Sequence, residues 1–390
     1  MENDDLEFTP YRDIFPYKTF RPQQREMLDE TFNVVAHGAD ERVLLISAPT
    51  GSGKSSNVIP AIKYAKANMM KVIIAISTKT QISIYINELE SIIGLDKLDT
   101  HLVTNFSSMF NNCLSLPKAP DYDLSNATNI SSFLNGCRKI EELPNYDLKK
   151  VTTANNAFAN CYNLSKVPQS ILNLPSCASC ESMFNACSSL TSIGNIDAPI
   201  VTALNSMFYN CTNLQKVGEI NAPECTSYKE MFYNCKFRYA PITEFYKGKD
   251  LTGIYNSCNS MIEIDHMNAP EATTLYNAFY SCRAIRKIGR INAPKCTDAR
   301  GMFNACWYVV SIDLSGMVLS SLTQYSSIFS NCGRNARPDD GAYAQNIPYI
   351  YVRNEEDRTW LLNLSSSYRP TSWNTNNVIV AGSAQDLREK

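Results

Sequence analysis

The segment with the most specific chemistry is Ala48-Pro49-Thr50-Gly51-Ser52-Gly53-Lys54-Ser55. It follows an apolar run at residues 43–47 and opens a stretch with helical character at about residues 54–70, which is the context that a phosphate-binding loop requires. In such a loop, backbone N–H groups and the helix N-terminus hold the phosphates, the lysine reaches the β- and γ-phosphates, and the hydroxyl after it binds Mg²⁺. We therefore expect ATP and Mg²⁺ to bind at Pro49, Thr50, Gly51, Ser52, Gly53, Lys54 and Ser55, with Ser55 on the metal. The alternative is an ordinary glycine-rich turn between a strand and a helix.

The elements around this loop predict an α/β unit. A second apolar run covers residues 72–77 and a second helical stretch covers about residues 82–93, so the order is strand, helix, strand, helix. Two strands and two helices are less than half of a RecA-like sheet, and they leave sheet edges and apolar helix faces uncovered. The fold expected for residues 1–98 is therefore a truncated P-loop, RecA-like βαβα unit that either docks on the following residues or is marginally stable.

A second motif lies upstream of the loop, at Phe20-Arg21-Pro22-Gln23-Gln24. Together with the glycine-rich loop it resembles the start of the XPD/DinG group of superfamily 2 DNA helicases, in which these residues form the Q motif. The resemblance implies that Arg21 and Gln24 belong to the nucleotide site, with Gln24 on the adenine edge. It also implies that Thr78-Lys79-Thr80 corresponds to motif Ia, which contacts single-stranded DNA. A polar helix start and a solvent-exposed strand end are the respective alternatives.

The resemblance to helicases stops at about residue 93. No Asp-Glu-x-His sequence follows, and no second RecA-like domain with arginine fingers is visible, although a helicase of this group needs both. A phosphate loop without these parts holds the nucleotide but does not position and activate the attacking water. We expect ATP binding with little or no hydrolysis, assign no catalytic residue, and leave open whether the chain is an enzyme. A helicase that acts in trans with a partner supplying the missing motifs is an alternative.

A sequence repeat begins at about residue 103. Ten cysteines recur at intervals of 23–26 residues, and we call them the ladder cysteines: Cys113, Cys137, Cys161, Cys187, Cys211, Cys235, Cys258, Cys282, Cys306 and Cys332. Phe stands three positions before most of them, and apolar residues stand three and six positions after most of them. A fixed period in the twenties is the signature of a solenoid, in which stacked copies share one core because a single copy cannot bury its own apolar face.

Each repeat can be divided into expected elements. The Met-Phe-x-x-Cys part predicts one or two helical turns with Phe and Cys facing inward. A short strand follows, and in three copies proline ends it because proline cannot donate to a ladder: Asn221-Ala222-Pro223, Asn268-Ala269-Pro270 and Asn292-Ala293-Pro294. A threonine is then the expected N-cap of the next helix: Thr202, Thr226, Thr273 and Thr297. Arg238 takes an apolar slot after Cys235, so we expect a bulge or loop within residues 237–251.

This repeat resembles the BspA-type leucine-rich repeats of microbial surface and phage-associated proteins over about residues 103–335. The resemblance implies a leucine-rich-repeat solenoid of about ten 24-residue repeats, which we place at residues 99–335. Residues 336–390, which include Ile350-Tyr351-Val352, Trp360 and Trp373, are expected to form a C-terminal capping segment. With the helicase-like fragment at residues 1–98, the chain is expected to have three parts.

The composition narrows the class of protein. The 390 residues carry 36 Lys and Arg against 38 Asp and Glu, which excludes a polybasic nucleic-acid binder by bulk charge. The acidic start and the lack of a long apolar run predict a cytoplasmic protein without a membrane span, with the cell surface as the alternative. In the cytoplasm the 14 cysteines are expected to be reduced. Four of these cysteines have the spacing of a metal-binding group: Cys161, Cys177, Cys180 and Cys187. The repeat accounts for all of them except Cys180, so we expect buried thiols rather than a metal site.

The expected role of the solenoid is binding. Side chains five positions after the ladder cysteines are mixed in sign, with no continuous acidic or basic stripe: Lys118, Glu142, Lys166, Ser192, Lys216, Glu263, Lys287 and Ser311. Repeat arrays usually present an extended face to a partner, so we expect an unidentified protein or glycan there, or else a stable scaffold or spacer. The whole sequence predicts an ATP-binding, helicase-derived module fused to an interaction solenoid. The alternative is a BspA-like surface, adhesion or phage-associated ligand-binding protein with a vestigial N-terminal segment.

Overall fold

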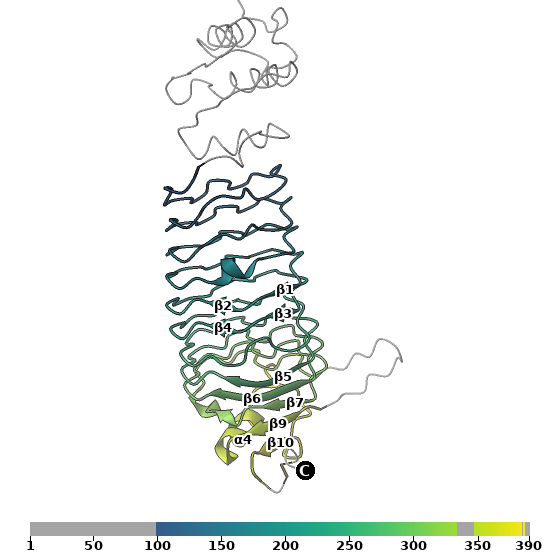
Figure 1. Cartoon of the computed structure of the whole chain (residues 1–390). Helices are drawn as coiled ribbons and strands as arrows, with labels where there is room; N and C mark the ends of the chain where they lie inside the picture. The colour runs from purple at the N-terminus through teal and green to yellow at the C-terminus, as the bar shows by residue number, and fades with distance from the viewer. Residues whose placement is uncertain (1–98, 334–346, 384, 387–390) are drawn as a thin grey trace, which may run out of the picture. The chain divides into compact units, whose positions relative to one another are not determined.

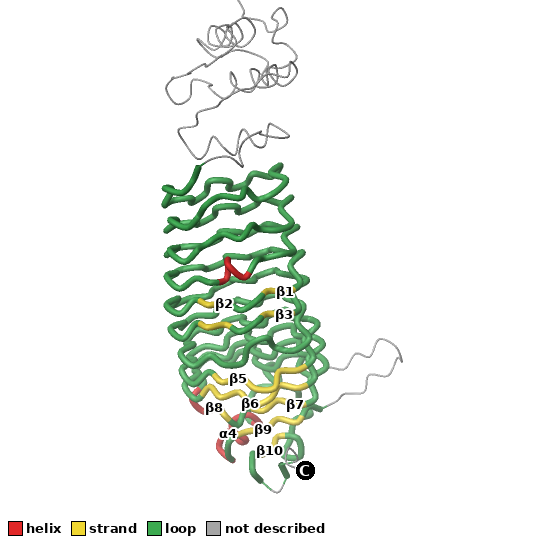
Figure 2. Tube along the Cα trace, viewed as in Figure 1, coloured by secondary structure: helices red, strands yellow, loops and turns green. Residues whose placement is uncertain are grey.

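The computed structural model describes residues 99–333, 347–383 and 385–386. The chain divides into two units, residues 1–92 and 93–390, and the described residues all belong to the second unit. The P-loop fragment expected at residues 1–98 therefore lies outside the described residues and stays a prediction. Figures 1 and 2 show the second unit as a stack of similar coils, each of which we call a rung.

Successive rungs pair in parallel. β1 (Ser192–Ile193) pairs with β3 (Lys216–Val217), and β2 (Ile196–Asp197) pairs with β4 (Ile220–Asn221). A six-stranded sheet has the order β10-β9-β7-β6-β5, with β8 also on β6: β5 (Glu263–Asn268), β6 (Lys287–Ala293), β7 (Ser311–Asp313), β8 (Gly316–Met317), β9 (Tyr349–Val352) and β10 (Val378–Val380). Single parallel bridges, such as Asn105 with Asn129, continue this pairing through the other rungs. The predicted repeat solenoid is confirmed and is a parallel β-solenoid.

Equivalent residues lie beside one another because of this winding. Ile264 pairs with Ile288, and Ile288 pairs with Ile312, so one inward-facing position forms a continuous apolar row. The residues three before the ladder cysteines form a second row of stacked rings, with centroids 5.3–5.9 Å apart: Phe158, Phe184, Phe208, Phe232, Tyr255, Phe279, Phe303 and Phe329. The ring spacing follows the separation of about 4.8 Å between paired strands. These rows are the core that a single repeat could not form.

The ladder cysteines combine two properties that the core requires. The thiols of the eight ladder cysteines from Cys137 to Cys306 each donate to a backbone carbonyl of the preceding rung, with Sγ–O distances of 3.0–3.2 Å. The acceptor is always the residue three positions before the ladder cysteine of that rung, as with Cys211 and Phe184. A thiol is small and apolar enough for the interior and still donates a weak hydrogen bond. Burial raises the pKa of Cys211 and of Cys258 to about 12, so these groups remain neutral thiols.

The predicted helical turns before the cysteines are wrong. In the rung of Cys211, Ser206 and Asn210 have φ angles of 53° and 57°, which reverse the chain twice within five residues. The N–H groups of Ser206, Phe208 and Asn210 donate to carbonyls of the next rung at 2.8–2.9 Å. Hydrogen bonds between rungs thus replace the i to i−4 bonds of an α-helix. Asn and Gly recur at the left-handed positions because they adopt this conformation at little cost, and Ser, Ala and Glu also stand there.

The threonines do not cap helices either. The hydroxyl of Thr226 donates to the carbonyl of Thr202 at 3.3 Å, and the hydroxyl of Thr297 donates to the carbonyl of Thr273 at 3.3 Å. They form a ladder along the stack instead of binding N–H groups of their own rung. The role predicted for proline is confirmed, since β4 ends at Asn221, β5 at Asn268 and β6 at Ala293, each directly before the Ala-Pro or Pro of its repeat.

The rung after Cys235 keeps its place in the stack. Tyr239 pairs with Glu263, and Glu244 pairs with Asn268, so residues 237–251 follow the neighbouring rung rather than leaving it as a loop. In most repeats an apolar residue stands three positions after the ladder cysteine, where this rung has Arg238. Phe237 and Phe245 are fully buried and fill the core in its place. The expected departure is seen on the other side, where among the described residues no strand bridge joins residues 237–248 to residues 215–225 of the preceding rung.

Residues 347–383 extend the stack at its C-terminal end. β9 continues the parallel sheet on β7, and α4 (Glu355–Leu362) packs beside it, with its first turn capped by the Asn354 side chain. Trp373 lies on Phe329, with ring centroids 4.8 Å apart, and so covers the last ring of the stacked row. Two 3₁₀ helices, η3 (Gln169–Leu172) and η4 (Leu319–Ser321), together with α4 are the helices of the described residues.

Candidate functional site

The nucleotide site predicted from the sequence lies outside the described residues. This applies to Arg21, Gln24 and residues 49–55, including the Mg²⁺ ligand Ser55, and to the DNA-contacting segment Thr78-Lys79-Thr80. ATP, Mg²⁺ and single-stranded DNA therefore remain predictions for the first unit. The surfaces with defined geometry belong to the solenoid.

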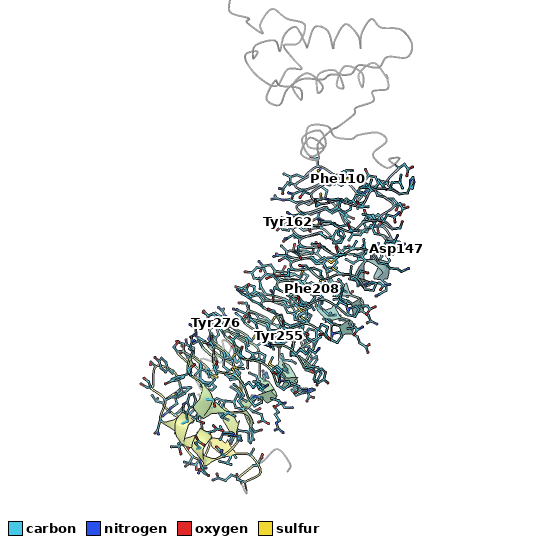
Figure 3. The ribbon with its side chains drawn as sticks, turned by 90° about the vertical axis from the view of Figure 1, so that its left-hand side faces the viewer. Phe110, Asp147, Tyr162, Phe208, Tyr255 and Tyr276 are labelled. Carbon is cyan, nitrogen blue, oxygen red and sulfur yellow. The ribbon has the colours of Figure 1, made fainter. Side chains whose placement is uncertain are left out.

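One face of the solenoid is built from the turns around the ladder cysteines. We call it the turn face and define it as the described residues six, five, two and one positions before each ladder cysteine and one and two positions after it, except the buried Ala159, Phe237 and Ser281. Tyr162 and Tyr276 belong to this face and lie along one edge of the stack in Figure 3, whereas Asp147 lies along the opposite edge. The left-handed residues place these side chains outward while Phe and Cys point into the core.

The turn face is poor in acidic residues. Residues 99–333 contain 18 acidic and 18 basic side chains, and only two of the acidic ones, Glu181 and Glu230, lie on the turn face. Six basic side chains lie there: Arg138, Lys139, Lys229, Lys236, Arg283 and Arg300. The other faces therefore carry the compensating negative charge. Asp298, just outside the turn face, binds Arg300 at 2.8 Å and neutralises that guanidinium, so the excess positive charge is moderate.

Aromatic side chains on this face are held in pairs between rungs. The Tyr209 and Tyr233 rings stack with centroids 4.4 Å apart. Arg guanidinium groups lie over three other rings: Arg138 over Tyr162 at 5.2 Å, Arg283 over Trp307 at 4.5 Å and Arg300 over Tyr276 at 4.8 Å. Tyr162, Tyr276 and Tyr280 are more than a third exposed. The stacked Phe row lies in the core, whereas this second group of aromatic side chains lies on the turn face.

Amide side chains fill much of the remaining turn face. Asn135 donates to Asn111 at 3.0 Å, and Asn234 donates to Asn210 at 2.9 Å, each across one rung. Asn135 also accepts from the Asn160 amide at 2.9 Å, so these bonds fix a row of side chains across three rungs. The turn face is thus a fixed array of aromatic, guanidinium, amide and hydroxyl groups.

The side chains five positions after the ladder cysteines form a stripe that lies outside the turn face. Lys166 pairs with Glu142 at 3.3 Å, and Lys287 pairs with Glu263 at 2.7 Å, each on the preceding rung. Strand pairing brings Ser192 beside Lys216 and Lys287 beside Ser311, as the repeat register predicted. Two of the four lysines of this stripe are therefore paired with its two glutamates, and exposed pairs of this kind contribute little to stability.

A charged cluster at His266 crosses two rungs. Its Nε2 lies 2.7 Å from Glu244 Oε1, and its Nδ1 lies 3.1 Å from Asp265 Oδ2. These hydrogen bonds, that of Glu244 first, raise the pKa of His266. Hydrogen bonds from Asn268 and then His266 lower the pKa of Glu244. Both ring nitrogens face carboxylates, so the imidazolium is the form that donates to both.

The cysteines outside the ladder occupy buried positions. Cys180 fills the slot seven positions before its ladder cysteine, where Leu204 and Leu275 stand in other rungs, and this explains the cysteine that the repeat pattern left unassigned. Cys180 forms a hydrogen bond with the thiol of Cys177, and this bond lowers the pKa of Cys177 and raises the pKa of Cys180. Across the described parts of the chain, no three His, Cys, Asp or Glu side chains are grouped so as to hold a metal ion.

The repeat is also recognised by comparison with known proteins. Three segments of the chain, residues 80–193, 141–245 and 249–341, match a family model described as "Mycoplasma protein of unknown function, DUF285". This chain belongs to that family. Together the segments cover more than half of the chain, and their succession agrees with a repeated unit. None of the helices within the described residues is long and apolar enough to cross a membrane.

Comparison of the chain with solved structures and with curated proteins adds little to the family assignment. A crystal structure of a leucine-rich repeat protein from Bacteroides ovatus ATCC 8483 is 13% identical, and the match covers 71% of this chain and 87% of that chain with a TM-score of 0.26. No curated protein matches.

Proposed function

We propose that the solenoid is a protein-interaction module and that the turn face is its binding surface. The observation that carries the proposal is the composition of this face, on which Tyr, Trp, Arg, Asn and Ser stand and from which sixteen of the eighteen acidic side chains of residues 99–333 are absent. Tyr, Trp and Arg supply most hot spots of protein interfaces, and Asp and Glu are depleted there. Tyr, Ser and Asn also dominate the binding loops of antibodies.

The rigidity of the face supports the same proposal. The Tyr209–Tyr233 and Arg283–Trp307 pairs each join equivalent positions of neighbouring rungs, so both partners are held before any binding event. Side chains that are already ordered lose less conformational entropy on binding. The rungs repeat this arrangement along the stack, which suits a partner with an extended contact surface.

The test compares two double variants of the full-length protein. Arg283→Ala with Trp307→Ala removes a cation–π pair from the turn face, whereas Arg286→Ala with Lys287→Ala removes two charges from outside it. Proteins retained from an extract of the source organism are quantified by mass spectrometry, and each candidate is then purified and titrated. We expect one protein to bind the wild type and the control variant with equal affinity. Its affinity for the turn-face variant should be lower by about tenfold or more.

Two results would contradict this proposal. One is a partner whose affinity is equal for both variants, which would place the contact on another face. The other is binding of purified glycans, but of no protein, with the same dependence on Arg283 and Trp307. Circular dichroism and thermal unfolding of both variants establish that each is folded before binding is compared.

A second function is proposed for the segment before the solenoid, on the strength of the motif at residues 48–55. We propose that it binds ATP with Mg²⁺ through Lys54 and Ser55, as in the helicases that it resembles, and that it hydrolyses ATP slowly or not at all. Binding of a fluorescent ATP analogue is measured for the full-length protein, for Lys54→Ala and for the control Lys66→Ala. Loss in Lys54→Ala alone is expected, with turnover unchanged by single-stranded DNA. Equal binding by all three proteins would contradict the role of Lys54, and no binding by any of them would contradict nucleotide binding and favour the BspA-like alternative with a vestigial N-terminal segment.

A further inference from the structure

The C-terminal end of the solenoid contains a polar cavity apart from the turn-face aromatics. Its volume is about 430 Å³, and it lies between the last ladder rung and the segment after α4. Hydroxyl and amide groups line much of it, including those of Ser330, Asn331, Ser366, Thr371 and Ser372. Among the described residues that line it none is acidic, and the charged one is Arg369, through its guanidinium.

Arg369 is held in place but its charge is not compensated. Its Nη1 donates to the carbonyl of Pro370 at 3.0 Å, and its Nη2 donates to the carbonyl of Leu362 at the end of α4. Its Nε is buried and has no partner among the described residues. No carboxylate of the described residues lies within 4.0 Å of this guanidinium, whereas the neighbouring Arg353 and Arg358 are paired with Asp357 and Glu355 at 3.0 and 2.6 Å.

A buried donor without a partner is costly, and a guanidinium without a counter-charge favours an anion. Charge-assisted hydrogen bonds from Arg to a carboxylate or phosphate are stronger than bonds between neutral groups. We propose that this cavity binds the oxyanion group of a small hydroxylated molecule, with Arg369 facing the anion. The volume exceeds that of an isolated phosphate, and the lining hydroxyls and the Asn331 amide suit the hydroxyl groups of a sugar-like body.

The experiment uses the full-length protein and defined probes. Glucose 6-phosphate and glucuronate carry a phosphate and a carboxylate on the same kind of body, and glucose is the neutral control. Binding is measured by isothermal titration calorimetry with the wild type, Arg369→Gln, Arg369→Lys and the distant control Arg290→Gln. We expect at least one anionic probe to bind, glucose to bind at least tenfold more weakly, and Arg369→Gln to lose tenfold or more in affinity. Arg369→Lys is expected to retain part of it because the charge remains.

Several outcomes would overturn the site. Equal affinity of the wild type and Arg369→Gln, or equal affinity for glucose and glucose 6-phosphate, would show that the guanidinium does not select an anion. Absence of binding by both probes to folded wild-type protein also excludes the proposal. Thermal unfolding separates a folding defect of Arg369→Gln from a loss of binding, and Arg369→Lys provides the second variant.

Discussion

At the scale of single residues, the solenoid uses small polar side chains where most cores use aliphatic ones. The ladder cysteines donate to carbonyls of the preceding rung, and the threonine hydroxyls do the same on the surface. Tyr255 stands in the row of Phe rings because its hydroxyl reaches the carbonyl of Ile242. The cysteine and threonine groups satisfy backbone acceptors of the preceding rung, and Tyr255 satisfies an acceptor that stands 13 residues before it. In each case the residue type is set by the acceptor that lies opposite the side chain.

The His266 cluster predicts a stability that depends on pH. The pKa of His266 is raised in the folded protein, so its contribution is complete below its ordinary pKa of about 6.5 and is lost as the pH rises through the raised value. We expect His266→Gln to lower the unfolding midpoint more at about pH 5.5 than at about pH 9. The side chains are 40–43% exposed, so the difference should stay below about 1 kcal/mol. An equal offset at both pH values, measured by thermal unfolding, would contradict this assignment.

At the scale of elements, each rung is shaped by turns rather than by regular strands. The strands shown in Figure 2 are short, and the segments between them reverse direction at left-handed residues such as Asn210 and Gly301. The sequence pattern Ser-Met-Phe-x-Asn-Cys has the spacing of a helix, which explains the incorrect prediction. Bonds to the next rung compete with bonds inside a helix, and only the stacked structure supplies those partners.

Close contact between rungs makes one glycine of β6 irreplaceable. A Cβ added at Gly289 would lie 1.5 Å from the backbone oxygen of Asp265, so the two strands would have to separate. We expect Gly289→Ala to lower the free energy of unfolding by about 3 kcal/mol. Urea denaturation followed by circular dichroism measures this change.

Gly194→Ala is the matched control for that substitution. A Cβ there would meet the Oε1 atom of Gln169, which belongs to an exposed side chain that can move. Its effect should remain below about 1 kcal/mol. Similar losses for the two variants would indicate that the contact at Asp265 does not limit the spacing of the rungs.

At the scale of the whole solenoid, stability depends on covering its ends. Contacts run mainly between neighbouring rungs, so an exposed terminal rung would leave its apolar side open to water. The segment around α4 prevents this at the C-terminal end through the Trp373–Phe329 contact and through the fully buried carboxylate of Asp357. That carboxylate accepts hydrogen bonds from the backbone of Leu319 and from Arg353.

Removing this carboxylate should detach the end of the stack. Asp357→Ala leaves the buried N–H of Leu319 and the Arg353 guanidinium without their acceptor, so we expect a loss of about 2–3 kcal/mol. Trp fluorescence should shift to longer wavelength before the main unfolding transition, because Trp373 becomes exposed first. Glu356→Ala, at an exposed position of the same helix, should change stability by less than about 0.5 kcal/mol. A single transition at the wild-type midpoint in Asp357→Ala would show that the cap does not depend on this carboxylate.

The repeat, its register, the inward-facing Phe and Cys rows and the strand ends before proline could all be predicted from the sequence, because a periodic apolar pattern and the missing donor of proline act locally. Three features could not: the double turn of the Met-Phe-x-x-Cys segment, the bond from Thr226 to the rung before it, and the contacts of Arg with aromatic side chains on the turn face. They depend on hydrogen bonds and ring contacts between residues about 24 positions apart. Such contacts exist only after one rung has stacked on the next.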